Sequence, residues 1–305
     1  KEMWPAWEQA IETMETWQNE LSDNAPNPDR WHALLEGRKG RTQKDYTVEV
    51  SKKKVEEVET GWNEEDKARR YYSSGVGAGA WLEPTEGAEP LANQHFCITA
   101  RRMLGCDCLV QNGVDKCCNS ARSGTNAGTK CGRPLDPRGG HALRCHLGGG
   151  VKKRHDGVRD ALKAWLTTQG IAAEIEQDIP EWARADEGAI LDVVYRDGAA
   201  GRVCIDVSIT DGAQIARQGR PWRFVLERRE RLKHTRYPGP GLRPFVVDVG
   251  GRWGREAVAW LRQVVRKLPE EDRSQAAQSC RSAVAMALQS QCAEQVCSAH
   301  SARGA

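Results

Sequence analysis

The sequence lacks any long apolar run. No stretch of about 18 consecutive apolar residues occurs among its 305 residues, and a membrane-spanning helix needs a stretch of roughly that length. The start of the chain also lacks the basic and then apolar pattern of a secretory leader. We therefore expect no membrane span, no membrane partner and no export. The first residue is Lys1 rather than methionine, so we expect either a fragment of a longer protein or a sequence that lacks its true start.

An excess of one charge is also missing. The formal net charge is only +3 although 29% of the residues are charged, so the overall charge does not indicate a nucleic-acid partner. Local charge is segregated, however. Glu174 to Asp197 contains eight acidic and two basic residues, and Arg217 to Arg236 contains eight basic and two acidic residues. The basic segment suits a phosphate backbone, although a solvated helix is the simpler interpretation.

Composition divides the chain into five segments. Residues 2–21 carry apolar side chains at steps of three and four, which predicts an amphipathic helix. A polar linker follows, and the Lys- and Glu-rich residues 46–72 predict a solvated helix. The five segments are a helical and charged N-terminal region with a linker (1–72), a connector with a short helix (73–104), a cysteine-rich segment (105–150), an α/β domain that opens with a basic helix (151–268), and a flexible or weakly helical tail (269–305).

The cysteines favour a metal site over disulfides. Seven of the 11 cysteines lie between Cys97 and Cys145, and a clustered Cys/His set without a secretory signal is typical of metal binding. The tightest element, CGRPLDPRGGHALRC, contains Cys131, His141 and Cys145. His141 and Cys145 are one helical turn apart and can reach the same ion. Structural zinc sites use four Cys or His ligands in a tetrahedron.

The fourth zinc ligand must come from upstream. We take Cys118 as the first ligand, while Cys117, Cys106 and Cys108 remain alternatives. His146 is an alternative to Cys145. A closed four-ligand site leaves no position for water, so it would be structural rather than catalytic.

The stretch ILDVVYRDGAAGRVCIDVSITDG, Ile190 to Gly212, reads as two strands around a glycine-containing turn. Folding about residues 197–200 pairs positions whose numbers sum to about 398, which sets Asp192 across from Asp206 on the same face. Such neighbours have Cβ atoms about 4.5–5.5 Å apart, so the two carboxylates repel each other. A hard cation such as Mg²⁺ removes this conflict. The alternative is that the acids face water from an edge strand.

Other residues can complete a site around these acids. Glu176 is our candidate for a third acid, and Glu174 shares its alternation and remains an alternative. Lys233 and Tyr237 are four residues apart and would share a helix face, from which a lysine can activate water or stabilise a phosphate charge. The predicted DNA-contacting residues are Lys152, Lys153, Arg154, His155, Arg159, Arg228 and Arg229.

The ordered motifs GGHALRCHLGGG, RHDGVRDAL, AILDVVY, CIDVSI, KHTRY and PFVVDVGGRWG resemble the restriction-like endonuclease domain of site-specific non-LTR retrotransposon polyproteins. The upstream SGVGAGAWL resembles the connector between reverse transcriptase and endonuclease in such polyproteins. The resemblance covers about residues 73–265. It implies a PD-(D/E)XK-type α/β core with a mixed central sheet flanked by helices, residues 151–268. A small zinc knuckle, residues 105–150, and helical N-terminal segments precede that core.

The resemblance also implies roles for single residues. Asp192 and Asp206 match the first and second acids of the family. Ser208 stands where many restriction enzymes carry a lysine, and the retrotransposon variants use a lysine and a tyrosine on the following helix, which map onto Lys233 and Tyr237. The chain departs from the family in having a leucine rather than a proline before Asp192, and in a stretched spacing before the second zinc ligand.

The function implied by the resemblance is Mg²⁺- or Mn²⁺-dependent nicking of DNA to prime reverse transcription, with a structural Zn²⁺. The implied partners are DNA, RNA of the parent element and an upstream reverse transcriptase, and the implied location is nuclear. The chain itself contains no YxDD polymerase motif. Two alternatives remain: a catalytically decayed nucleic-acid-binding zinc module, and a zinc-stabilised scaffold for protein partners.

Overall fold

The computed structural model describes residues 59–83, 89–108, 115–121, 127–184, 188–198 and 201–300. The helix predicted over 2–21, the polar linker and the first half of the charged segment (46–58) lie outside these residues. Within the described part, no helix is both long enough and apolar enough to cross a membrane. From Trp62 onward the chain forms one compact unit, so the cysteine-rich segment and the α/β segment are described together.

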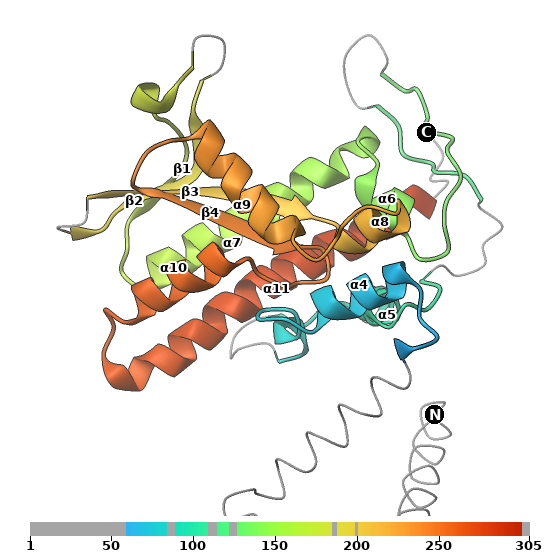
Figure 1. Cartoon of the computed structure of the whole chain (residues 1–305), viewed down its shortest axis with the longest axis horizontal. Helices are drawn as coiled ribbons and strands as arrows, with labels where there is room; N and C mark the ends of the chain where they lie inside the picture. Colours follow the sequence, from blue (N-terminus) through green and yellow to red (C-terminus); the bar gives the residue numbers. More distant parts are fainter. Residues whose placement is uncertain are drawn as a thin grey trace, which may run out of the picture. The chain divides into compact units, whose positions relative to one another are not determined.

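A mixed four-stranded sheet lies at the centre of this unit (Figure 1). Its strands are β1 (Ala173–Asp178), β2 (Ile190–Arg196), β3 (Arg202–Thr210) and β4 (Leu242–Asp248), in that spatial order. The first three form an antiparallel meander, and β4 lies parallel to β3. Helices occupy the crossover from β3 to β4, as a parallel connection requires. The predicted α/β class, a mixed sheet flanked by helices, is confirmed.

The hairpin of β2 and β3 has the predicted register. Val193 pairs with Ile205 and Tyr195 with Val203, so partner numbers sum to 398. Odd-numbered residues of β2 are buried, in agreement with the predicted alternation. β3 is buried on both faces because helices cover both sides of the sheet. Asp206 is therefore buried together with its apolar neighbours.

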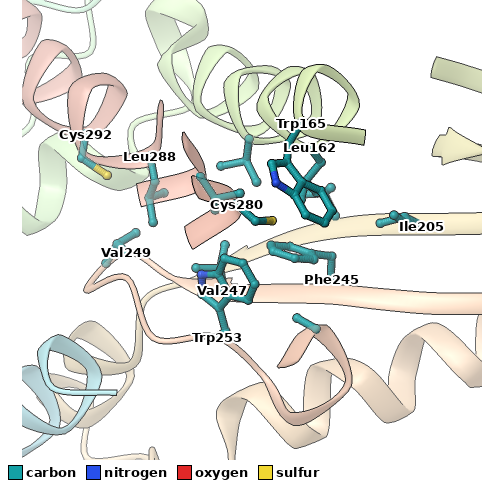
Figure 2. Close-up of a cluster of buried hydrophobic side chains, with 14 of the residues drawn as sticks. Leu162, Trp165, Ile205, Phe245, Val247, Val249, Trp253, Cys280, Leu288 and Cys292 are labelled. Atoms are coloured by element: carbon teal, nitrogen blue, oxygen red, sulfur yellow. The ribbon is translucent and has the colours of Figure 1, made fainter. Parts of the chain in front are cut away.

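One face of the sheet packs against α7 (Gly150–Thr168), α10 (Arg255–Val265) and α11 (Glu270–His300). Figure 2 shows side chains of α7, α11 and β4 meeting in this core. Trp165 of α7 and Phe245 of β4 both contact Trp260 edge-to-face, with ring centroids 5.8 Å apart in each pair. Trp260 Nε1 donates a hydrogen bond of 3.0 Å to the Tyr195 hydroxyl. Large aromatic side chains thus hold α10 and α7 on the same side of the sheet.

The opposite face is covered by α9 (Val225–Arg236), with α4 (Glu64–Ser73) and α8 (Gly212–Arg217) beside it. Tyr72 of α4 packs with Trp222 and with Val246 of β4, and the Tyr72 hydroxyl donates a hydrogen bond of 2.5 Å to the Trp222 carbonyl oxygen. The prediction of a solvated helix is wrong for this part of the charged segment, because α4 buries both Ala68 and Tyr72.

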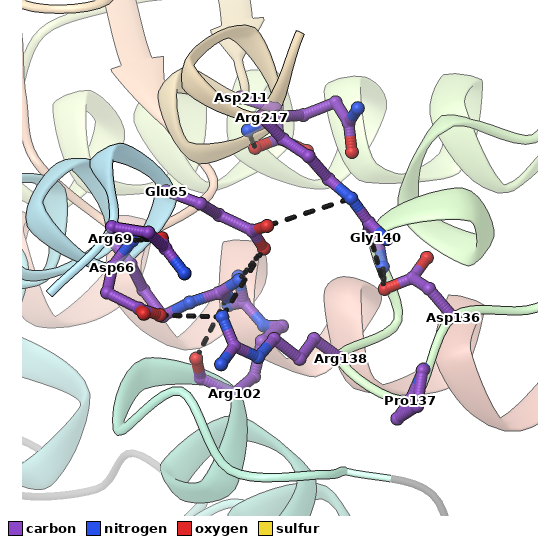
Figure 3. Close-up of polar contacts among 12 residues, drawn as sticks. Glu65, Asp66, Arg69, Arg102, Asp136, Pro137, Arg138, Gly140, Asp211 and Arg217 are labelled. Atoms are coloured by element: carbon purple, nitrogen blue, oxygen red, sulfur yellow. Dashed lines mark hydrogen bonds and ion pairs between the residues drawn. The ribbon is translucent and has the colours of Figure 1, made fainter. Parts of the chain in front are cut away.

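Charged side chains join α4 to the segments around it (Figure 3). Arg138 pairs with Asp66 at 2.6 Å, and Arg217 of α8 pairs with Glu65 at 3.7 Å. Within α4, Arg69 pairs with Glu65 at 2.6 Å. Arg69 also donates a hydrogen bond to the carbonyl oxygen of Arg102 in α5. The remaining helical elements are α5 (Asn93–Met103), α6 (Gly140–Arg144) and the 3-10 turns η1 (Ala80–Leu82), η2 (Leu147–Gly149) and η3 (Pro180–Trp182).

The C-terminal segment is a core helix. α11 lies along α7 and buries Cys280 and Leu288 in the main core. The prediction of a flexible or weakly helical tail is wrong because the buried side of this helix consists largely of alanine and cysteine. These small residues give only a weak amphipathic pattern, although alanine has the highest helix propensity.

Asp248 ends β4 with a buried carboxylate. Its Oδ2 accepts hydrogen bonds from the Gly212 amide at 2.7 Å and the Thr210 hydroxyl at 3.0 Å, and Oδ1 accepts one from the Gly250 amide at 2.8 Å. The carboxylate thus links β4, the start of α8 and the following turn. Burial raises the pKa of Asp248 to about 7, and the charge of Asp211 acts in the same direction.

Truncation in α11 should destabilise the whole unit. Leu288 is fully buried, and a buried Leu→Ala substitution typically costs about 2–5 kcal/mol. We expect Leu288→Ala to lower the free energy of unfolding by this amount in urea titrations. Gln275→Ala changes an exposed residue of the same helix and should stay within about 0.5 kcal/mol of wild type. If both variants behave like wild type, α11 does not contribute to the core.

Asp248 should give the free energy of unfolding a pH dependence. Its pKa is about 7 in the folded chain against an ordinary value of 3.8, so the folded chain holds one more proton between these values. The stabilisation from this proton is fully present below the ordinary pKa of 3.8. It is lost as the pH rises through about 7, where the free energy of unfolding falls by up to about 1.4 kcal/mol per pH unit. Urea unfolding should show it as the difference between wild type and Asp248→Asn. Parallel pH curves for the two proteins would contradict the shift.

Candidate functional site

Four side chains of the cysteine-rich segment converge on one point. They are Cys117, Cys131, His141 and Cys145, whose donor atoms all lie within 4.8 Å of one another. The sulfurs of Cys117 and Cys145 are 3.7 Å apart, and the Cys131 sulfur is 3.4 Å from His141 Nε2. A tetrahedral zinc ion, with bonds of about 2.3 Å to sulfur and 2.0 Å to nitrogen, separates such donors by about 3.5–3.8 Å. The four residues therefore fit a closed zinc site.

The first ligand is Cys117 rather than the predicted Cys118. Two isolated antiparallel bridges, one of which pairs Ser120 with Lys130, have partner numbers that sum to 250. Because this sum is even, odd-numbered residues of both strands share a face, so Cys117 lies on the face of Cys131 and Cys118 on the other. The Cys118 thiol contacts a carbonyl oxygen two residues earlier in the chain.

The other two ligands come from a short helix. His141 lies on α6, and Cys145 caps its C-terminus, in agreement with the predicted spacing of one turn. Asp136 accepts hydrogen bonds from the amides of Gly140 at 2.9 Å and His141 at 2.6 Å. This carboxylate satisfies the first amides of the helix and fixes its start beside the Cys117–Cys131 ribbon.

The surroundings favour the ligating forms of two residues. Burial, with the charges of Arg144 and Arg133, lowers the pKa of His141, which keeps the imidazole neutral near pH 7, as metal ligation requires. Burial disfavours the Cys131 thiolate, but hydrogen bonds from the Arg133 amide and the neighbouring thiols outweigh it and lower the pKa of Cys131. Burial raises the pKa of Cys117, which favours the neutral thiol. A bound cation would deprotonate it, because a thiol that coordinates a metal loses its proton.

The acidic site lies where β2 and β3 separate. Regular pairing begins at Val193 and Ile205, and Asp192 stands one residue beyond it. Asp192 Oδ2 accepts a hydrogen bond of 2.6 Å from the Val207 amide of β3. The carboxylate therefore bridges the two strands beside Asp206.

Asp206 is buried against a lysine of α9. Lys233 Nζ lies 2.5 Å from Asp206 Oδ2, and the two side chains are only 10% and 7% exposed. Burial raises the pKa of Asp206, the Lys233 ammonium opposes this rise, and the charge of Asp192 adds to it. The predicted reach of Lys233 back to the hairpin is observed.

His155 contacts the other hairpin aspartate from α7. Its Nε2 lies 3.3 Å from Asp192 Oδ2, and its Nδ1 lies 3.4 Å from Asp156 Oδ1. The hydrogen bond with Asp192 raises the pKa of His155 more than burial lowers it. The sequence predicts a DNA contact at His155 and gives no sign of this pair, because only the tertiary fold brings α7 beside β2.

Glu176 stands opposite Asp192 across the β1–β2 pairing. The pairs made by residues 175 and 177 have partner numbers that sum to 368, which places Glu176 level with Asp192, whereas Glu174 pairs with Val194. The register therefore favours Glu176 as the third acid. Its carboxylate is 56% exposed and pairs with Arg159 at 2.5 Å. Its φ of +52° is unusual for a residue with a side chain and is a form of strain found at functional sites.

Four of the predicted DNA-contacting residues lie on the surface. Lys152 and Lys153 of α7 and Arg228 and Arg229 of α9 are exposed. Arg229 Nε donates a hydrogen bond of 3.2 Å to the Ser208 hydroxyl of β3, two residues along the strand from the acidic site. Lys152 also pairs with Asp156 at 3.1 Å but stays 74% exposed, so all four side chains lie within reach of a phosphate backbone.

Two other predicted contacts are buried. Arg154 donates a hydrogen bond of 2.9 Å to Gln295 Oε1 of α11. Arg159 is 9% exposed and pairs with Asp156 at 3.3 Å as well as with Glu176. Because both guanidiniums are engaged inside the fold, the surface contacts predicted for Arg154 and Arg159 are not supported.

Tyr237 shares the buried face of α9 with Lys233, as the spacing predicts. Its ring packs with Leu191 and Cys204, and the Arg236 guanidinium lies 5.0 Å from the ring centroid. The Tyr237 amide donates to the Lys233 carbonyl oxygen at 2.8 Å and closes the last turn of α9. The ring thus forms part of an apolar cluster beside the acids.

The acidic site does not group its donors as tightly as the Cys/His cluster. In the described part of the chain, only the Cys/His cluster places three or more ligand atoms this close together. Asp206 and Asp192 have Lys233 and His155 as their partners instead. This arrangement balances two carboxylates with two nitrogen bases, which suits proton transfer and charge stabilisation at one site.

No protein-family model matches the chain, and no curated protein matches it either. A functional conclusion therefore depends on these side chains and their contacts.

Zinc content should distinguish Cys117 from its neighbour. We expect wild-type protein to contain about one zinc ion per chain and Cys117→Ser to lose most of it, because three ligands remain where a structural site needs four. Cys118→Ser removes the adjacent thiol outside the cluster and should retain the metal. Elemental analysis of protein prepared under reducing conditions measures both. A wild type without zinc, or equal loss in the two variants, would show that the cluster is wrongly assigned.

Proposed function

We propose that the chain is the endonuclease domain of a retrotransposon polyprotein, with a PD-(D/E)XK-type core, that nicks target DNA to prime reverse transcription. The observation that carries the proposal is the convergence of Asp192, Asp206, Lys233 and His155 from four elements, β2, β3, α9 and α7. The ordered motifs and the mixed sheet flanked by helices support it. DNA, RNA of the parent element and an upstream reverse transcriptase are then its partners, and the nucleus is its place of action.

Asp192 and Asp206 would hold the divalent cation, Mg²⁺ or Mn²⁺. Carboxylate oxygens are the ligands that such hard cations prefer. Asp206 Oδ2 is buried, and its contact with Lys233 is an ion pair without an aligned hydrogen bond, so this oxygen retains bonding capacity. A cation bound here would lower the pKa of a water molecule and offset the charge of the phosphate.

Lys233 and His155 each act beside one acid of this pair, Asp206 and Asp192 respectively. Lys233 supplies a fixed positive charge where negative charge develops on the phosphate. It takes the place of the lysine that β3 lacks, since Ser208 follows Asp206 on the same face. His155 holds Asp192, and Asp156 holds the second ring nitrogen of His155, which fixes the orientation of the imidazole.

Exposed lysine and arginine side chains on two helices would position the DNA. Lys152 and Lys153 lie on α7, the helix of His155, and Arg228 and Arg229 lie on α9, the helix of Lys233. Contacts from such side chains to phosphates fix the register of a nucleic acid without reading its sequence. The Cys/His cluster would have a structural rather than a catalytic role, because four protein ligands leave no position for water on the zinc ion.

The acids should be required for nicking. We expect Asp192→Asn and Asp206→Asn to lower the rate of plasmid nicking at least about 100-fold, because each loses a negative ligand for the cation and the charge balance of the site. Asp178→Asn changes an exposed acid at the end of β1 and should stay within about twofold of wild type. Gel assays with and without added Mg²⁺ or Mn²⁺ measure this.

Circular dichroism and zinc content show whether each of these variants is folded. Unchanged nicking in both acid variants, or nicking that needs no divalent cation, would show that this site does not cleave DNA. A folded wild type that binds DNA in a salt-sensitive manner but never nicks it would favour the decayed zinc module instead.

A further inference from the structure

The segment that leads into α9 forms an exposed cleft. The cleft has a volume of 380 Å³, and its lining includes Ala216, Arg220, Trp222, Arg223 and Phe224. Phe224 is 68% exposed, although Trp222 beside it is buried against Tyr72. An apolar ring thus stands in solvent at the edge of a cleft whose floor is fixed by the core.

The charges around this ring are basic and mostly uncompensated. Arg220 and Arg228 are exposed and form no ion pair with any side chain in the described ranges, and the Arg223 guanidinium lies 5.4 Å from the centroid of the Trp222 ring. Glu64, which also lines the cleft, already accepts hydrogen bonds from Trp222 Nε1 at 2.9 Å and Lys67 Nζ at 3.0 Å.

The start of α9 adds to this positive potential. No side chain caps its first turn, and the amide end of a helix carries a partial positive charge, which Glu227 of the first turn offsets in part. The cleft is therefore suited to an anionic ligand with flat apolar surfaces.

A line along α9 connects Phe224 to the acidic site. Leu226, Glu230 and Lys233 form the buried face of this helix. Phe224 precedes Lys233 by nine residues, which is about 14 Å along the axis and about half a turn around it, so the exposed ring stands on the opposite side of the helix from Lys233. Arg229 lies between them and hydrogen-bonds Ser208, two residues from Asp206 on β3. One element thus carries the lysine of the acidic site, an arginine beside it and the exposed ring.

We infer that Phe224, with Arg220 and Arg228, is a stacking platform for an unpaired base of single-stranded nucleic acid. Every base offers a flat face that can stack on an aromatic ring, and arginines follow the backbone phosphates. Where the acidic site cleaves DNA, as proposed above, a strand that reaches both sites must pass around the helix, so it spans at least about 14 Å, or roughly four nucleotides at 3.4 Å each. The platform then binds the same strand at least about four nucleotides from the phosphate that reacts.

Binding of a fluorescein-labelled 12-nucleotide single strand tests the platform without any cleavage. We expect Phe224→Ala to weaken binding about 5- to 100-fold, the range measured for the loss of one stacked base. Phe224→Trp should retain wild-type affinity, since the ring is preserved. Leu232→Ala removes another exposed apolar side chain of α9, 51% exposed, and should stay within about twofold. Arg220→Gln should lower the slope of log Kd against log salt by about one.

The position of the stacked base is tested with 2-aminopurine placed at successive positions of the strand. Stacking should quench its fluorescence at one position about four or more nucleotides from the nick, and Phe224→Ala should remove this quenching. Equal affinities for Phe224→Ala and Leu232→Ala, or the same loss of affinity for a duplex of the same sequence, would overturn the single-strand platform. A wild type that never nicks but shows Phe224-dependent binding would support the platform and reject only the endonuclease.

Discussion

A buried ion pair between Lys233 and Asp206 joins the sheet to α9, and the rest of the acidic site depends on it. Removing one partner of such a pair typically costs about 3–5 kcal/mol, because the other charge stays buried without compensation. The pair therefore fixes the position of α9 against β3. Tyr237 extends this contact beside the pair, and Arg229 extends it on the other side through Ser208. Asp192 completes the arrangement by bridging β2 to the Val207 amide.

The parts of the site that the sequence predicts are those set by local periodicity. Strand alternation and the turn length give the β2–β3 register from Val193–Ile205 to Arg196–Arg202, and Asp192 and Asp206 each stand one residue beyond its open end. One helical turn sets the relation of His141 to Cys145, and another sets that of Lys233 to Tyr237. In each case the spacing along the chain is the same as the spacing in the folded element, so no tertiary information is needed.

The parts that the sequence does not predict depend on contacts between distant segments. The choice of Cys117 over Cys118 follows from the parity of a two-bridge ribbon whose loop length no apolar pattern sets. α11 packs through alanine and cysteine, which carry little periodic signal, yet it buries the Arg154 guanidinium that the sequence assigns to the surface. His155 reaches Asp192 only because α7 crosses beside the strands. In each case the prediction from local pattern fails because a contact between distant segments decides where the side chain lies.

The two candidate centres have different chemistry, with soft sulfur and nitrogen donors in one and hard carboxylate oxygens in the other. The central claim is that Asp192 and Asp206 together hold a divalent cation. Anomalous diffraction from crystals grown with Mn²⁺ tests it most directly. The account predicts an anomalous peak between these two carboxylates, and its loss in Asp206→Asn crystals. Diffraction that locates zinc at the Cys/His cluster but no manganese at the acids would contradict it.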